Sequence, residues 1–198
     1  MIVRKRLNNP GKSDPSKERQ NLYFIALVPH QELIDEIREI KEEVKILTQA
    51  KSILKSPAHI TVQKPFKRPD RLEPQIIKSL RHFSSAQKPF EIELEGYDAF
   101  PPRVIFIRVK DHNHITDLHT GLKKILAGEL SFSDNELMVD IHPHVTLTTR
   151  YLTSPGFYNA WPLFKEREFN ASFKVKELCL LKHDGQKWNI FYRFKFES

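Results

Sequence analysis

A four-residue pattern that occurs twice narrows the folds open to this chain of 198 residues. The first copy is His59-Ile60-Thr61-Val62 and the second is His144-Val145-Thr146-Leu147. Each copy alternates polar and apolar residues, which is the period of a β-strand. The two apolar residues then face the core, and the histidine and threonine face the other way. Two such strands at a distance along the chain predict two related halves.

The rest of the sequence predicts further strands and helices in a similar order in both halves. Apolar runs and alternating patterns predict strands over 22–28, 58–62, 90–95, 104–109, 145–147, 173–181 and 187–196. Helical spacing of apolar residues predicts helices over 33–47, 72–83, 115–125 and 155–168. A capping-box pattern starts at Asp70, and Pro162 breaks the apolar pattern of the last helix, which should therefore be irregular. The predicted fold class is α+β, built from two related lobes.

Composition and charge favour a single globular unit with an anionic partner. Residues 1–20 are polar and basic and predict a flexible extension, so the folded domain should span 21–198. The formal net charge is +7, of which the part outside the extension carries only +3. This excess favours a substrate that bears phosphate without identifying one.

Several classes of protein are not expected from this sequence. We find no apolar run long enough to cross a membrane and no secretory signal. The single cysteine, Cys179, allows no internal disulfide and is expected to be a buried, unreactive thiol. We therefore expect a cytoplasmic protein without membrane partners.

The repeated pattern suits the chemistry of phosphate esters. In-line displacement at phosphorus needs a proton acceptor on the attacking side and a proton donor on the leaving side. Histidine can take both roles near neutral pH, and threonine hydroxyls can donate hydrogen bonds to the phosphate oxygens. One copy in each half would place His59 and His144 on either side of one phosphate.

Other uses of these residues have to be weighed. A single His-x-Thr in a strand is most often structural, but two copies in corresponding strands favour a functional site. His142 and His144 could bind a metal with a third ligand, yet no carboxylate or cysteine cluster accompanies them, so we predict neither a metal site nor a cofactor. Three further histidines are expected at the surface, namely His112, His114 and His119. The aromatic residues are expected mostly in the core; they are Tyr23, Phe24, Phe66, Tyr151, Tyr158, Trp161 and Trp188.

The two patterns resemble the motifs of the two-histidine phosphoesterase superfamily, which includes 2′–5′ RNA ligases and RNA 2′,3′-cyclic phosphodiesterases. The resemblance rests on the segments 59–66, which reads HITVQKPF, and 143–147, which reads PHVTL. It extends over about residues 21–196. It implies two pseudo-symmetric lobes of antiparallel sheet, with helices packed outside and a water-filled cleft between them.

The resemblance also implies roles for individual residues. His59 and His144 would be the general acid and base, and Thr61 and Thr146 would bind the phosphate. Arg150 matches a basic position that many members have after the second motif, although a solvated surface arginine is an alternative. Lys64 is a weaker candidate for the same task. The basic extension has no counterpart in the motifs.

We therefore expect a metal-independent enzyme, a monomer, that hydrolyses a 2′,3′-cyclic phosphate at an RNA end or on a related nucleotide. Run in reverse, the same site could join RNA ends through a 2′–5′ linkage. Two alternatives stay open at this point. One is a non-catalytic RNA-binding module with a basic cleft, and the other is the same chemistry on a small cyclic nucleotide or an ADP-ribose cyclic phosphate.

Overall fold

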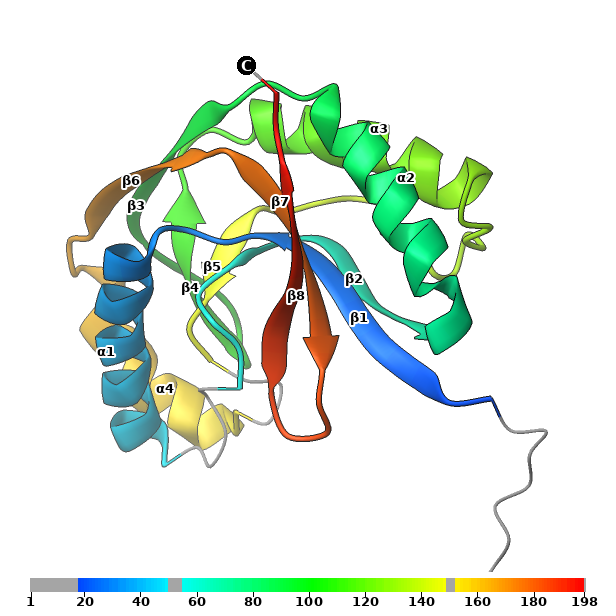
Figure 1. Cartoon of the computed structure of the whole chain (residues 1–198). Coiled ribbons are helices and arrows are strands. Elements are labelled where there is room, and N and C mark those ends of the chain that lie inside the picture. The colour runs from blue at the N-terminus through cyan, green and yellow to red at the C-terminus, as the bar shows by residue number, and fades with distance from the viewer. Residues whose placement is uncertain (1–17, 50–54, 149–151, 198) are drawn as a thin grey trace, which may run out of the picture.

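One continuous antiparallel sheet organises the protein. The computed structural model describes residues 18–49, 55–148 and 152–197, and its strands within these ranges form an eight-stranded sheet in the order β6-β3-β4-β5-β2-β1-β7-β8 (Figure 1). The strands are β1 (Gln20–Leu27), β2 (Ile60–Pro69), β3 (Phe90–Phe100), β4 (Val104–Val109), β5 (His144–Thr146), β6 (Asn170–Val175), β7 (Glu177–His183) and β8 (Trp188–Lys195).

The sheet consists of two similar halves that meet at its centre. One half is β6-β3-β4-β5 and the other is β2-β1-β7-β8. They join where β2 pairs with β5 through Ile60 and Val145, the apolar residues that follow the two histidines. The predicted α+β class with two related lobes is confirmed, and the two lobes share a single sheet.

In the described ranges, four helices cover one face of this sheet in two pairs. They are α1 (Gln31–Thr48), α2 (Glu73–Ser85), α3 (Asn113–Gly128) and α4 (Ser154–Lys165), with a short 3₁₀ turn η1 (Asp70–Leu72) before α2. Helix α1 packs on α4 and α2 packs on α3, at separate ends of the sheet (Figure 1). The side chains that face these helices form the main hydrophobic core.

The two faces of the central strands differ as the alternating pattern predicts. Ile60, Val62, Val145 and Leu147 are completely buried under the helices. His59 and the two threonines point to the opposite side, which we call the open face, together with His144, and all four are partly exposed. A smaller apolar cluster of Phe24, Ala26, Cys179 and Leu181 also lies on the open face.

One prediction about the start of a helix is wrong. The capping box does not form, because the carboxylate of Glu73 instead accepts hydrogen bonds from Asn21, Tyr23 and Lys182. Helix α4 forms where a helix is predicted and continues through Pro162.

The predicted strand over 173–181 is in fact two strands that belong to different halves. Strand β6 pairs with β3 at one edge of the sheet, whereas β7 pairs with β1 in the other half. Only Lys176 separates them. A local pattern of apolar residues cannot report this change of partner, because apolar residues occur in both strands and no glycine or proline separates them.

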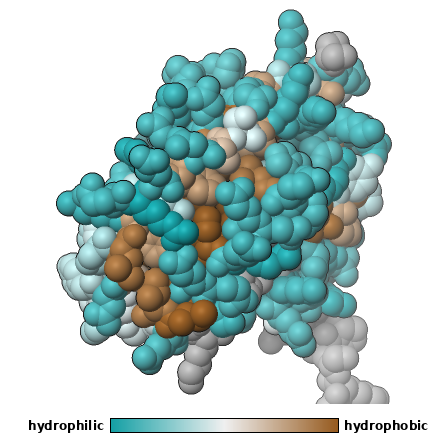
Figure 2. Space-filling model, turned by 90° about the vertical axis from the view of Figure 1, so that its left-hand side faces the viewer, coloured by the Kyte–Doolittle hydropathy of each residue, from teal (hydrophilic) through white to brown (hydrophobic). Residues whose placement is uncertain are grey.

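The surface of the molecule is mostly polar. Figure 2, which faces the side of the molecule that is on the left of Figure 1, shows a largely hydrophilic surface with smaller apolar areas. Among the described residues, no helix combines the length and the apolar character that a membrane span requires. Most of the predicted extension, residues 1–17, lies outside the described residues.

Candidate active site

The two predicted histidines lie on neighbouring strands at the centre of the sheet. His59 directly precedes β2 and His144 is the first residue of β5. Since Ile60 pairs with Val145 in antiparallel register, continuing that register by one residue sets His59 opposite Thr146 and Thr61 opposite His144. The two histidines are then diagonal neighbours on the open face, a relation that places Cβ atoms on the order of 7–8 Å apart.

Both imidazole rings are held in the same way by the backbone. Nδ1 of His59 lies 2.8 Å from the carbonyl oxygen of Pro57, and Nδ1 of His144 lies 2.6 Å from the carbonyl oxygen of His142. A carbonyl can only accept, so each Nδ1 must carry a proton and donate it. Nε2 of each ring therefore remains for exchange of a proton with a ligand.

A phenylalanine from the adjoining strand packs against each ring. The ring centroid of Phe24 in β1 lies 4.8 Å from that of His59, and the ring centroid of Phe106 in β4 lies 4.8 Å from that of His144. The two halves thus repeat the contact as well as the motif. These phenylalanines limit the rotation of the imidazoles and reduce their access to water.

The surroundings of both histidines favour the neutral form. The pKa of His59 is lowered to about 4, chiefly by burial and then by the positive charges of Lys41 and His144, while the hydrogen bond to Pro57 acts in the opposite direction. Burial also lowers the pKa of His144, with the backbone of His142 opposing this shift. At neutral pH both free rings can accept a proton at Nε2.

The threonines stand where the motif predicts, within the same group on the open face. Thr61 pairs with Ala26 of β1 and Thr146 pairs with Phe106 of β4. Each hydroxyl is two residues from the histidine of its own strand and is set opposite the histidine of the other strand. The arrangement therefore brings two imidazoles and two hydroxyls, from segments 85 residues apart, to one place on the sheet.

The structure describes one of the two basic candidates. The ammonium of Lys64 donates a hydrogen bond to the carbonyl oxygen of Asn135 at 2.8 Å, so it is engaged with the loop before β5. Arg150 lies outside the described residues.

The remaining histidines and the cysteine are placed as follows. His142 lies close to both His112 and His144 in the same region, yet within the described ranges no three His, Cys, Asp or Glu side chains are grouped so that they could hold a metal ion. His119 was expected at the surface and is buried, because it falls on the core side of α3. Cys179 is buried as predicted, and burial raises the pKa of its thiol to about 12.

Sequence comparison connects this arrangement with a known family. The sequence model of the 2'-5' RNA ligase superfamily matches residues 28–187. "Putative phosphoesterase BH1439" of Halalkalibacterium halodurans is 28% identical over 142 residues, which is 70% of this chain and 79% of that protein. "Putative phosphoesterase Bcer98_0945" of Bacillus cytotoxicus is 23% identical over 141 residues, which is 70% of this chain and 78% of that protein.

Solved structures of low sequence identity share the fold. TT0787 of Thermus thermophilus superposes with a TM-score of 0.64 at 19% identity, covering 88% of this chain and 97% of that one. LigT of E. coli in complex with 3'-AMP superposes with a TM-score of 0.65 at 16% identity, covering 91% of this chain and all of LigT.

Proposed function

We propose a function from one premise: the chain belongs to the 2'-5' RNA ligase superfamily. We infer that it is a phosphodiesterase that uses His59 and His144, without a metal, to hydrolyse a 2′,3′-cyclic phosphate at an RNA end or on a related nucleotide. The observation that carries this proposal is the shared geometry of the two rings. Each donates from Nδ1 to a backbone carbonyl two residues earlier, and each presents Nε2 on the open face.

The proposed reaction moves two protons around one phosphorus atom. A water molecule attacks phosphorus and gives its proton to Nε2 of one histidine. The bond from phosphorus to one ribose oxygen breaks, and that oxygen takes a proton from Nε2 of the other histidine. The product keeps a phosphate monoester on the second ribose oxygen. Thr61 and Thr146 would donate hydrogen bonds to the non-bridging oxygens as charge builds on them.

The electrostatic surroundings favour His59 as the base in hydrolysis. Its pKa of about 4 keeps it neutral in the free enzyme. His144 would then be the acid, and it must gain a proton as the anionic phosphate binds, since the nearby negative charge raises the pKa of an imidazole. With the 5′-hydroxyl of another RNA end in place of water, the same steps would break the bond from phosphorus to the 3′-oxygen, protonate that oxygen and form a 2′–5′ linkage.

A ligand of related chemistry in a structural neighbour supports the choice of substrate. LigT of E. coli has been solved with 3'-AMP and with phosphate. A cyclic phosphate on a ribose combines the features of both ligands. We extend this chemistry to the present chain as part of the proposal, and we expect the chain to act as a monomer in the cytoplasm.

The test is hydrolysis by the purified protein, in the presence of chelator, of RNA ends and nucleosides that carry a 2′,3′-cyclic phosphate. His59→Ala and His144→Ala should each lower kcat by at least about a hundredfold, the usual contribution of a positioned acid or base. His82→Ala is the matched control, because His82 is exposed on α2. Wild-type turnover in both histidine variants would overturn the assignment. RNA binding without any turnover would favour a binding module instead.

A further inference from the structure

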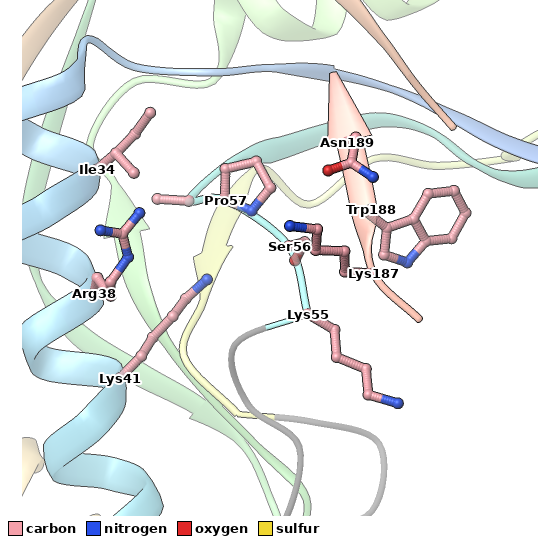
Figure 3. A pocket seen from close by; sticks show the side chains of 10 residues that line it. Ile34, Arg38, Lys41, Lys55, Ser56, Pro57, Lys187, Trp188 and Asn189 are labelled. Carbon is pink, nitrogen blue, oxygen red and sulfur yellow. The ribbon is translucent and has the colours of Figure 1, made fainter. Parts of the chain in front are cut away.

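A basic pocket lies beside the first histidine motif. It has a volume of about 240 Å³ and is enclosed by α1, by residues 55–58 and by the start of β8. In Figure 3 the side chains of Arg38 and Lys41 extend from α1 toward the segment before β2, and Lys187 approaches that segment from the other side. The backbone N–H of Trp188 donates to the carbonyl of Lys55 at 2.7 Å, which fixes the β8 wall on this segment.

The pocket collects positive charge with little compensation. Of the described residues that line it, none is acidic and four are basic: Arg38, Lys41, Lys55 and Lys187. Arg38 is ion-paired with Asp35 at 2.7 Å, near the surface of α1. Among the described residues, no carboxylate lies within ion-pair distance of the three lysines.

One acidic residue, Asp184, lies near Lys187, but its carboxylate accepts hydrogen bonds within the turn between β7 and β8. One carboxylate oxygen of Asp184 accepts the backbone N–H groups of Gln186 and Lys187, at 2.8 and 2.9 Å, and the other accepts the side-chain amide of Asn189 at 2.7 Å. Asp184 therefore holds the turn, and its charge only partly offsets that of Lys187.

Lys41 is the most unusual member of this group. It is only 4% exposed, although it carries an ammonium group. Burial, followed by the charge of Arg38, lowers its pKa to about 8. An uncompensated buried charge is costly, whereas the same charge beside an anion is stabilised. A lysine held in this state, at the wall of an open pocket, favours the binding of an anion there.

The pocket adjoins the proposed reaction centre. Pro57 and Ala58 form part of its wall, and the carbonyl of Pro57 is the group that holds Nδ1 of His59. Lys41 is close enough to lower the pKa of His59 by its charge. An anion in the pocket would therefore lie next to a phosphate bound between the two histidines.

We propose that the pocket formed by Arg38, Lys41, Lys55 and Lys187 binds a second phosphate group of the substrate, next to the cyclic phosphate that reacts. This inference rests on the proposed function and narrows it, since it excludes a nucleoside cyclic phosphate with no other charge as the preferred substrate. The second phosphate could be the 5′-phosphate of a mononucleotide or the diester that links the last two nucleotides of an RNA. The chemistry that the pocket recognises is the same in both.

Three substrates with the same base separate these cases. They are a nucleoside 2′,3′-cyclic phosphate with a free 5′-hydroxyl, the same compound with a 5′-phosphate, and a dinucleotide that ends in the cyclic phosphate. We expect the wild type to favour one of the two compounds that carry a second phosphate by about ten- to a hundredfold in kcat/KM, the usual range for a hydrogen bond between charged groups. The compound that is favoured identifies the source of the second phosphate.

Variants then assign the preference to the pocket. Lys41→Met and Lys187→Gln should each reduce, by about tenfold, the ratio of kcat/KM between the favoured substrate and the one without a second phosphate. Lys187 lies in an exposed turn, so its variant should fold even if Lys41→Met does not. Lys45→Met is the matched control on the same helix, because Lys45 pairs with Glu42 away from the pocket, and it should keep the full ratio.

The results that would overturn this inference differ from those that would overturn the proposed function. Equal kcat/KM for all three substrates, or an unchanged ratio in both pocket variants, would exclude the second phosphate site while hydrolysis persisted. If no substrate is hydrolysed, the proposed function fails. Titration calorimetry of the same compounds with the His144→Ala protein then tests the second phosphate site by itself. Equal affinities for all three compounds would exclude that site.

Discussion

Replacing His59 by asparagine should change how the stability of this protein depends on pH. In the folded protein burial and the charge of Lys41 lower the pKa of His59 to about 4, whereas an unfolded chain has the ordinary value of about 6.5. Between these values the unfolded chain binds a proton that the folded protein does not. The wild type must therefore lose stability as the pH falls from about 6.5 to about 4.

The size of this effect follows from the two pKa values. At pH 7.5 the imidazole is neutral in the folded and in the unfolded state, so its ionisation contributes almost nothing to the free energy of unfolding. At pH 5 it is protonated in nearly every unfolded chain and in about one folded molecule in ten, which lowers the free energy of unfolding by about 2 kcal/mol. The His59→Asn protein has no imidazole at this position and escapes this loss. Its free energy of unfolding relative to that of the wild type should therefore rise by about 2 kcal/mol as the pH falls from 7.5 to 5.

Urea unfolding of both proteins at the two pH values measures this difference, and the midpoints should converge or cross as the pH falls. The matched control is His114→Asn, which changes an exposed histidine on α3 and corrects for a general effect of histidine removal. A difference between wild type and His59→Asn that stays constant from pH 7.5 to pH 5 would refute the reasoning. The choice of His59 as the base would fall with it.

Further predictions concern the rate of hydrolysis, the basic pocket and the junction of β2 and β5 between the two halves. The pH profile of kcat/KM for cyclic-phosphate hydrolysis should be bell-shaped, with an acid limb near pH 4 from His59 and an alkaline limb below pH 6.5 from His144; two limbs above pH 7 would contradict this assignment. Lys41→Met removes a positive charge and should raise the pKa of His59, so the acid limb should move to higher pH while the alkaline limb stays in place. Ile60→Ala should lower the free energy of unfolding by about 2–5 kcal/mol in urea titrations, because the side chain is completely buried at the junction of β2 and β5. A loss below about 1 kcal/mol would contradict this, because it would mean that neighbouring side chains fill the space that Ile60 leaves. Dialysis against chelator should leave kcat unchanged, and a loss of activity restored by added metal would exclude the proposed mechanism.

The central strands could be predicted from sequence because their pattern is local. In the segments 59–62 and 144–147 each apolar residue faces the helices and each polar one faces the open side, so the order of residues alone indicates which face each side chain occupies. The repetition of this pattern also predicted the symmetry between the halves. What it could not give is their contact through Ile60 and Val145, which depends on the pairing of distant strands.

The errors occur where a partner elsewhere in the fold decides the structure. Glu73 reads as part of a capping box, but Tyr23 and Lys182 lie across from it and bind its carboxylate. The segment around Lys176 reads as one strand, although the two sides of that residue pair with different halves of the sheet. Neither partner can be seen within a short window of sequence.

The basic pocket was not predicted from the sequence, although the position of one of its residues is unusual. Lys41 lies four residues after Ile37 and three before Val44, in the stripe of α1 that faces the core. A lysine at such a position conflicts with the amphipathic pattern and can therefore mark a functional group. The other lining residues come from a loop and from β8, and only the folded chain brings them to α1.

The order in which the strands occur along the chain has a consequence for biosynthesis. Residues 90–175 supply all four strands of one half, while the other half takes β1 and β2 from the beginning of the chain and β7 and β8 from its end. A ribosome must therefore finish almost the entire polypeptide before β1 gains its outer neighbour. An incomplete chain released early would expose the edge of β1, so truncation near the C-terminus should produce aggregation rather than a smaller working enzyme.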